Sequence, residues 1–167
     1  MKSKETLRLT AASLLLAVSL LIPSVLGGAV YLPIGPFTAT PASHVPTFLA
    51  MLLGPAMAGA VGFGSAVGFL KLGPVVATRA AMHIPVGVLG AWLLKRRVSF
   101  PLALAAIAPV HAGLEALVVL LFGFSIREAG SVVALGTLVH HFVDSAIAVL
   151  VWKVVYTRTS FGELTTR

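Results

Sequence analysis

The sequence contains no cysteine among its 167 residues, and only 10% of the residues are charged. Without cysteine the chain forms no disulfide, no thiolate metal site and no cysteine nucleophile. It also lacks the G-x-x-x-x-G-K-[ST] loop that holds nucleotide phosphates and the G-x-S-x-G turn of many serine hydrolases. No basic stripe with interleaved aromatic residues is present, so nucleic-acid binding has little support. If the protein moves a solute uphill, another subunit must therefore supply the energy.

Hydrophobic residues make up 58% of the chain, and its charged fraction is well below the ~25% of soluble domains. The chain is therefore predicted to be an all-α integral membrane protein. Apolar runs near the ~20 residues that cross a bilayer predict a bundle of six transmembrane helices. The runs lie at about 7–26, 43–53, 55–71, 74–95, 100–122 and 131–156. Because the connections are short, residues 1–167 are expected to form a single membrane domain.

The basic residues predict the orientation, since Lys and Arg accumulate in cytoplasmic loops. With the N-terminus inside, only Lys71 and Arg127 fall on the outer side, while Arg79 lies within a helix. The cytoplasmic group is Lys2, Lys4, Arg8, Lys95, Arg96, Arg97, Lys153, Arg158 and Arg167. Both termini are thus predicted to be cytoplasmic, and the net charge of +7 is explained by the membrane surface and its anionic lipids.

The long connection before the second helix, Val25 to Pro41, contains three prolines, three glycines and no charge. It cannot form a regular helix, and the predicted topology places it outside the cell. Two interpretations stay open, a lid folded over the bundle or an ordinary loop at the headgroup boundary. The second helix, Ser43 to Leu53, is unusually short, and short segments interrupted by proline often line transport cavities.

Three apolar segments each carry two ionisable residues four positions apart, which places each pair on one helix face. The pairs are Arg79 with His83, His111 with Glu115, and His140 with Asp144. A charged side chain costs about 2.5–3.5 kcal/mol at the centre of a membrane helix. We therefore expect these groups to face the interior of the bundle. Prolines within two residues of His44, His83 and His111 can kink the helices beside them.

Counting along the helices at ~1.5 Å per residue gives the depth of these groups. His111 and Asp144 fall near the midplane, and the other members of the pairs fall in the outer half of the membrane. His44, at the start of the second helix, is expected to be shallow. This distribution predicts an outward-facing polar pocket that is closed towards the cytoplasm. His141 points about 100° away from His140, so at most one of them faces the pocket.

Three interpretations of the polar groups remain open. Arg79 with Glu115, and a histidine with Asp144, could merely hold the helices together. Four histidines beyond a complete ion pair favour instead an aromatic, hydrogen-bonding ligand. The spacing of His111 and Glu115, repeated in the His140 pair, also occurs in helical zinc sites and would suit a metal-dependent intramembrane enzyme. No H-E-x-x-H signature accompanies it, so we predict no metal and no cofactor.

Small residues mark two helices as surfaces for close packing. Ser13 and Ala17 form such a pair on the first helix, where a neighbour within the chain or an external partner would fit. The third helix carries Gly59, Gly62, Gly64 and Gly68, and there we expect packing inside the protein.

The chain resembles the substrate-binding membrane subunits, or S-components, of energy-coupling factor (ECF) vitamin transporters, and most closely the niacin-specific members. Nearly the whole chain shares their pattern of six short-looped helices. The strings that carry the resemblance are ATPASHVPTFLAMLLGP at 39–55, RAAMH at 79–83, HAGLE at 111–115 and VHHFVD at 139–144. It implies a protein of the prokaryotic plasma membrane, without its own ATPase, that captures a vitamin from outside. Such a subunit works with a transmembrane coupling subunit and two cytoplasmic ATPases.

By the same resemblance, the face of Ser13 and Ala17 would meet the coupling subunit, and the first loop would gate the site. Cobalt and nickel relatives carry a histidine after the initiator Met, and Lys2 at that position argues against metal uptake. A variant of this interpretation is an S-component for a different vitamin.

The implied ligand contacts can be assigned by chemistry. Arg79 would hold a nicotinate carboxylate through two hydrogen bonds, while His83, His111 and His140 would contact the ring. His44, Glu115 and Asp144 complete the polar set, and Phe37 and Phe48 would form apolar walls. The two acids outnumber the one arginine, so an anionic ligand needs additional positive charge in the pocket.

Overall fold

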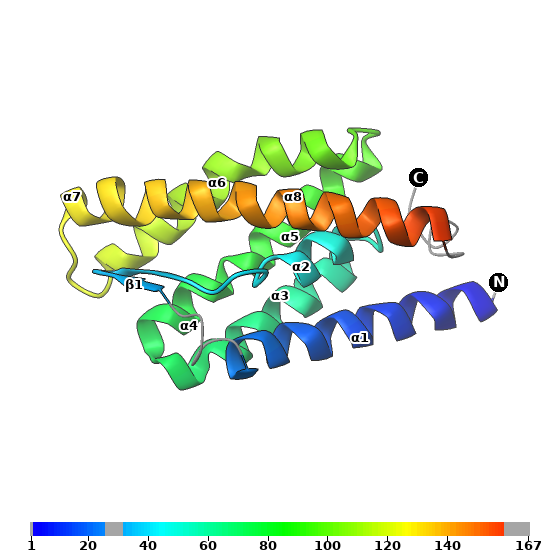
Figure 1. Ribbon diagram of the computed structural model, residues 1–167, viewed down its shortest axis with the longest axis horizontal. Coiled ribbons are helices and arrows are strands. Elements are labelled where there is room, and N and C mark those ends of the chain that lie inside the picture. The colour runs from blue at the N-terminus through cyan, green and yellow to red at the C-terminus, as the bar shows by residue number, and fades with distance from the viewer. Residues whose placement is uncertain (1, 26–31, 159–167) are drawn as a thin grey trace.

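The computed structural model describes residues 2–25 and 32–158, which form a bundle of long helices with one small hairpin (Figure 1). The helices are α1 (Lys2–Val25), α2 (Val45–Met51), α3 (Pro55–Phe69), α4 (Pro74–Ala81), α5 (His83–Lys95), α6 (Phe100–Leu120), α7 (Ile126–Glu128) and α8 (Leu135–Arg158). A 3₁₀ turn at Leu70–Leu72 follows α3, and a π-helical turn at Ala129–Ala134 joins α7 to α8. The strands are β1 (Leu32–Ile34) and β2 (Phe37–Ala39).

Five helical segments among the described residues are long and apolar enough to cross a membrane. They are Lys4–Val25, Pro55–Leu72, Pro74–Lys95, Phe100–Leu120 and Ile126–Val155. The second predicted helix is shorter than expected, because α2 has only seven residues and a length of ~10 Å. It cannot cross a ~30 Å hydrocarbon core, so a bundle of six spanning helices is not confirmed.

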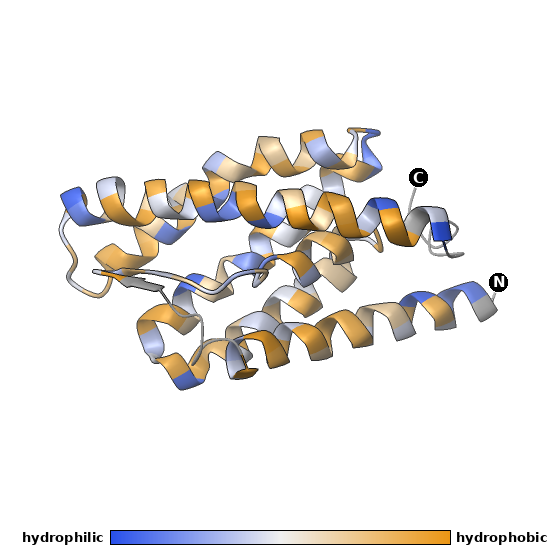
Figure 2. Cartoon of the chain, in the orientation of Figure 1, coloured by the Kyte–Doolittle hydropathy of each residue, from blue (hydrophilic) through white to orange (hydrophobic). Residues whose placement is uncertain are grey.

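The chain nevertheless makes a sixth passage along the bundle. In Figure 1 the first turn of α1 and the last turn of α8 lie at the same end, which five passages alone would not allow. The additional passage runs from the hairpin through the turns of residues 41–44 into α2. Figure 2 shows hydrophobic residues along the lengths of the helices and hydrophilic residues at the end where α1 begins and α8 finishes. The cytoplasmic orientation of that end and the single membrane domain remain predictions.

The hairpin occupies the part of the chain where the sequence excluded a helix. β1 and β2 pair antiparallel, with Ile34 opposite Phe37. Gly35 at the turn has a φ of 58°, which glycine adopts without a steric penalty. Residues 26–31 of the predicted loop lie outside the described residues, as does Arg167 of the predicted cytoplasmic group. The strands themselves were not predicted, because three residues are too few for a periodic pattern.

The glycines of α3 allow its close packing against α1 and α5. A Cβ at Gly64 would lie 2.8 Å from the hydroxyl oxygen of Ser19 on α1. A Cβ at Gly62 would lie 2.8 Å from the backbone carbonyl of His83, which fixes where α5 begins relative to α3. The predicted packing inside the protein is therefore confirmed for this helix. Ser13 and Ala17 of α1 face away from the bundle and are exposed.

The predicted helix 74–95 is interrupted at Met82, between α4 and α5. Pro85 accounts for the break, since it has no N–H to bond the Ala81 carbonyl and its ring crowds that group. The interruption confirms the predicted kink near His83. It also leaves Arg79 near the end of one short helix and His83 at the start of the next.

Candidate ligand-binding site

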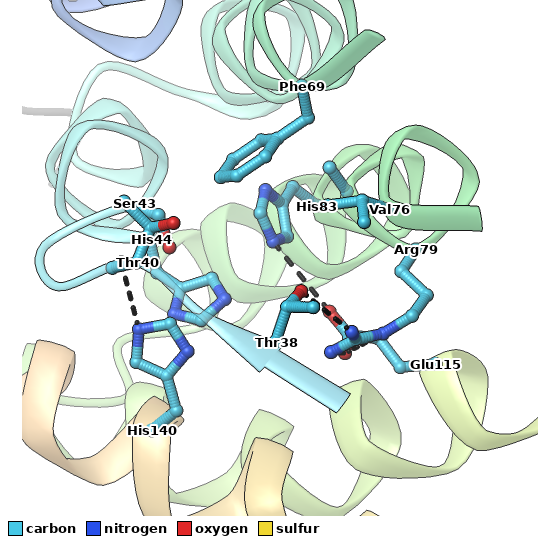
Figure 3. A pocket seen from close by; sticks show the side chains of 11 residues that line it. Thr38, Thr40, Ser43, His44, Phe69, Val76, Arg79, His83, Glu115 and His140 are labelled. Carbon is cyan, nitrogen blue, oxygen red and sulfur yellow. Dashed lines mark hydrogen bonds and ion pairs between the residues drawn. The ribbon is translucent and has the colours of Figure 1, made fainter. Parts of the chain in front are cut away.

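The structure brings all seven predicted ionisable residues together in the interior of the bundle. Figure 3 shows His44, Arg79, His83, Glu115 and His140 among them. They come from five elements: His44 precedes α2, Arg79 lies on α4, His83 on α5, His111 and Glu115 on α6, and His140 and Asp144 on α8. All are buried except His140, whose side chain is 11% exposed. The three pairs thus face one another, as their positions along the helices require.

Arg79 forms an ion pair with Glu115 across α4 and α6. Its Nε and Nη2 donate to Glu115 Oε2 at 3.0 and 2.5 Å. Its Nη1 donates to the Pro36 carbonyl at 3.2 Å and to the Thr38 hydroxyl at 3.1 Å, both in the hairpin. The guanidinium therefore connects the buried carboxylate to the segment that covers the site.

Glu115 has further polar neighbours on both oxygens. The Thr137 hydroxyl donates to Oε2 at 2.8 Å. On the other side, Nε2 of His111 lies 3.2 Å from Oε1, and Nε2 of His83 lies 4.0 Å from it. Glu115 is thus the point where the arginine and the histidines meet.

Asp144 anchors the segment between the hairpin and α2. Its Oδ1 accepts from the backbone N–H of Ala42 at 2.9 Å, and its Oδ2 accepts from that of His44 at 3.0 Å. The same Oδ2 lies 2.8 Å from Nδ1 of His44 and 3.2 Å from Nε2 of His140. His140 Nε2 also bonds the Thr40 carbonyl at 3.2 Å, which requires a proton on that nitrogen. One carboxylate on α8 therefore positions the whole entry into α2.

His44 lies at the centre of the cluster, and the prediction that it is shallow is wrong. Its ring centroid lies 4.6 Å from that of His83, 4.7 Å from that of His111 and 4.5 Å from that of His140. The turns at residues 41–44 place it inside the bundle, which a count along a full-length membrane helix does not anticipate. His44 therefore shares the level of residues that were placed near the midplane.

The structure adds polar contacts that the sequence did not predict. His141 is fully buried and faces α6, where its Nδ1 lies 3.0 Å from Nδ1 of His111. Only His140 of the adjacent pair lines the cavity, as the 100° offset between them requires. The Ser65 hydroxyl lies 2.9 Å from Nδ1 of His83. Serine and threonine are common in membrane helices, so no sequence signal marks Ser65 or Thr137.

The polar groups surround a small cavity beneath the hairpin. Its volume is about 20 Å³, which is the space of one or two water molecules. It is lined by Thr38, Thr40, Ser43, His44, Phe69, Val76, Arg79, Ala80, His83, Glu115 and His140. In Figure 3, Thr38 on β2 lies between the His44 and His140 side chains and the Arg79–Glu115 pair. An aromatic acid needs several times this volume, so its entry requires that the hairpin or the lining side chains move.

The two predicted aromatic walls support the cavity from outside its lining. The Phe48 ring stacks on His44 with centroids 5.6 Å apart and contacts His141 at 4.8 Å. The Phe37 ring lies 5.2 Å from the Arg79 guanidinium carbon and packs edge-on against His140. Each ring therefore holds a lining residue in place rather than forming the wall itself.

The ion pairs fit the interpretation that these groups hold the helices together. Arg79 does pair with Glu115, and Asp144 lies against two histidines. With neutral histidines, however, the cluster holds two negative charges and one positive charge, and such an excess is costly in a buried site. Internal pairing alone therefore leaves one charge unbalanced.

No model of a known protein family matches the sequence. A curated protein, the niacin transporter NiaX of Lactococcus lactis subsp. cremoris (strain MG1363), is 36% identical to this chain. The aligned region covers 88% of this chain and 73% of NiaX. This likeness extends over nearly all of the described helices, including the segments that supply the buried cluster.

Proposed function

Because this chain belongs to the family of the niacin transporter NiaX, we propose that it captures niacin on the outer side of the cell membrane. Like its relative it is a multi-pass membrane transport protein and not an enzyme, so a metal-dependent intramembrane enzyme is not supported. We assign it the role of an ECF S-component, in which a coupling subunit and two ATPases drive the uptake.

The observation that carries the proposal is the buried Arg79, whose donors reach the cavity beneath the hairpin. Nicotinate is a small planar anion, and a guanidinium binds a carboxylate through two parallel hydrogen bonds. Nη1 of Arg79 now bonds Pro36 and Thr38 of the hairpin. When the vitamin enters, its carboxylate takes the place of these hairpin acceptors, and the imidazoles of His83 and His140 contact the ring.

The hairpin then acts as the cover of the site. It is held by bonds to Arg79 on α4 and, through Thr40, to His140 on α8. Both partners are also the proposed vitamin ligands, so binding and closure use the same side chains. This arrangement favours the lid interpretation of the first loop over an ordinary surface loop.

Nicotinate binding to the purified protein tests the proposed substrate. Titration calorimetry with the full chain in detergent should show one site for nicotinate and weaker binding of nicotinamide, which lacks the negative charge. Mass spectrometry of small molecules that co-purify provides an independent check. A co-purified vitamin of another mass, with no nicotinate binding, would assign the scaffold to a different substrate.

The exposed small residues on α1 are the proposed contact with the coupling subunit. Ala17→Trp should lower niacin uptake at least tenfold in cells that also express a coupling subunit and its ATPases, because the indole prevents close helix packing. Nicotinate binding to the purified variant should not change, since Ala17 is exposed and remote from the cluster. Val143→Trp on α8, where the native side chain is 52% exposed, is the matched control. Equal uptake by both variants would place the coupling surface elsewhere.

A further inference from the structure

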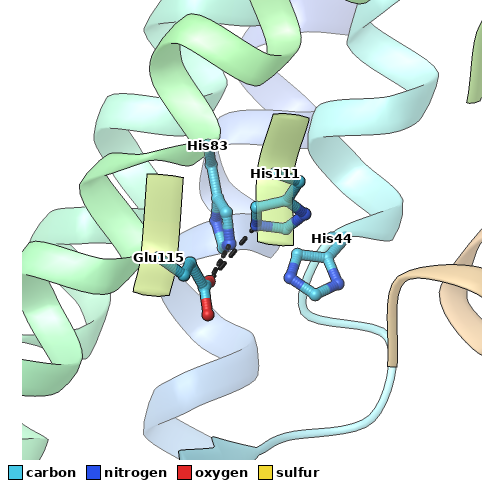
Figure 4. A group of neighbouring side chains, drawn as sticks. All are labelled: His44, His83, His111 and Glu115. Carbon is cyan, nitrogen blue, oxygen red and sulfur yellow. Dashed lines mark hydrogen bonds and ion pairs between the residues drawn. The ribbon is translucent and has the colours of Figure 1, made fainter. Parts of the chain in front are cut away.

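Three imidazoles and one carboxylate oxygen converge at a single point beside the cavity. His44, His83, His111 and Glu115 each direct one ligand atom into this point, and the four atoms all lie within 4.8 Å of one another (Figure 4). The group is buried, with Glu115 3% exposed and His111 fully enclosed. Three histidines with one carboxylate form a donor set that suits a divalent transition metal ion.

Each of the three imidazoles has a polar neighbour close to its Nδ1. His83 Nδ1 lies 2.9 Å from the Ser65 hydroxyl, and His111 Nδ1 lies 3.0 Å from His141. His44 Nδ1 lies 2.8 Å from the Asp144 carboxylate. Metal-binding histidines typically use one ring nitrogen for the metal and give the other to such a partner, which fixes the ring. Here the partners leave Nε2 of each ring for the common point.

The proton positions on His111 and His141 indicate independently that a positive charge lies between His111 and Glu115. His141 Nε2 faces the Leu104 carbonyl at 3.0 Å and must carry a proton there. In its neutral form, His141 Nδ1 therefore accepts, and His111 Nδ1 is the donor between them. A neutral His111 then directs the lone pair of Nε2 at Glu115 Oε1, 3.2 Å away. Two lone pairs at this distance require a positive charge, either a further proton or a metal ion.

The charge of the site favours a divalent ion over a proton. Arg79 contributes one positive charge, and Glu115 and Asp144 contribute two negative charges, which leaves the cluster at −1 when the histidines are neutral. One additional proton makes the site neutral, with no net attraction for an anion. A divalent ion makes it +1, and a bound nicotinate anion then makes it neutral.

We propose that His44, His83, His111 and Glu115 bind a divalent transition metal ion, with Zn²⁺ as the ion that best matches the donors. The metal site rests on the geometry and the charge of the cluster. Its role, which is to bind the vitamin as an additional ligand, rests on the proposed function. The assignment revises our sequence prediction of no metal. It also differs from the zinc grouping considered there, because His140 and Asp144 are not among the four converging residues.

Metal titration of the full-length protein tests the site. The chain should carry an affinity tag without histidines and be stripped with a chelator before addition of Co²⁺, which reports nitrogen ligation through its visible absorption. We expect one Co²⁺ per chain, its displacement by Zn²⁺, and a change in the spectrum when nicotinate is added. The thermal unfolding midpoint shows whether the stripped protein is folded. Folded, stripped protein that binds no Co²⁺ would overturn the proposal.

Two histidine variants locate the ion. His83→Gln should weaken Co²⁺ binding at least 100-fold, because Gln lacks the ring nitrogen that faces Glu115. Ser65→Ala, which removes only the partner of His83 Nδ1, should weaken it about 10- to 100-fold. His140→Gln should leave the affinity within threefold, since His140 is not in the group of four. Loss in His140→Gln with retention in His83→Gln would refute the assignment.

Nicotinate titrations separate this proposal from the proposed function. If the metal participates in capture, nicotinate binds at least tenfold more weakly to stripped protein than to metal-loaded protein. Equal affinity in both states would overturn the metal's role and leave niacin capture standing, with a proton on His111 as the balancing charge. A protein that binds Co²⁺ but no nicotinate in either state would retain the metal site and refute niacin capture.

Discussion

Arg79→Gln is expected to weaken nicotinate binding at least 100-fold and to destabilise the protein. The variant removes the positive charge that reaches the cavity and leaves the Glu115 carboxylate buried without its partner. Breaking a buried ion pair on one side typically costs about 3–5 kcal/mol. Calorimetric titration with nicotinate and the thermal unfolding midpoint in detergent measure the two effects separately.

Arg79→Lys is the matched control for this prediction. It retains a charge near Glu115 but cannot maintain the contacts of the guanidinium with Glu115, Pro36 and Thr38 together. Its unfolding midpoint should therefore lie much closer to that of the wild type, whereas nicotinate binding should still be reduced about tenfold or more. If the Arg79→Gln protein is folded and binds nicotinate with wild-type affinity, Arg79 is not a ligand of the vitamin.

The long helices could be predicted because hydropathy is a strong signal over twenty residues. The helix of residues 100–122 is an example, since its predicted bounds differ from those of α6, Phe100–Leu120, by only two residues. The second helix was harder, because the apolar residues Leu52 and Leu53 continue past the seven that are helical. Hydropathy does not mark where a helix begins, and the turn residues Ser43 and His44 that precede these seven are buried like them.

The polar cluster was partly predictable for a different reason. A residue such as Glu115 is costly in lipid, so its presence in an apolar run already indicates an internal partner. The pairing of Arg79 with Glu115 was one of the interpretations that their opposite charges left open. The contact of Asp144 with the backbone of Ala42 and His44 was not among them, because its partners are N–H groups that every residue carries.

The contact of His141 with His111 could be recognised only from the arrangement of the helices. Its neighbour His140 lies on the face of α8 towards the cavity. His141 is one residue further along the helix, so its ring points towards α6. The sequence excluded both residues from one pocket but gave no sign that His141 orients His111. Such support between side chains on different helices depends on the distance between α6 and α8, which hydropathy does not encode.

Asp144→Asn should lower the unfolding free energy by about 3 kcal/mol or more, because hydrogen bonds to charged groups contribute about 1.5–3 kcal/mol each. The carboxylate accepts from two backbone N–H groups, Ala42 on Oδ1 and His44 on Oδ2, and lies against two imidazoles. An asparagine side chain has only one oxygen, so its NH₂ group would face a donor instead of accepting from it.

Loss of the Asp144 carboxylate should also weaken ligand binding. Without the second acceptor, the segment before α2 no longer holds His44 at the centre of the cluster, so nicotinate binding should fall at least tenfold. Ser145→Ala is the control at the next position, since the Ser145 hydroxyl is buried with no hydrogen-bond partner among the described residues. Its removal should change stability by less than about 1 kcal/mol. Asp144→Asn could instead unfold at the same temperature as Ser145→Ala and bind nicotinate normally. The carboxylate would then not position α2, and the contacts of Arg79 with the hairpin would hold this segment in place.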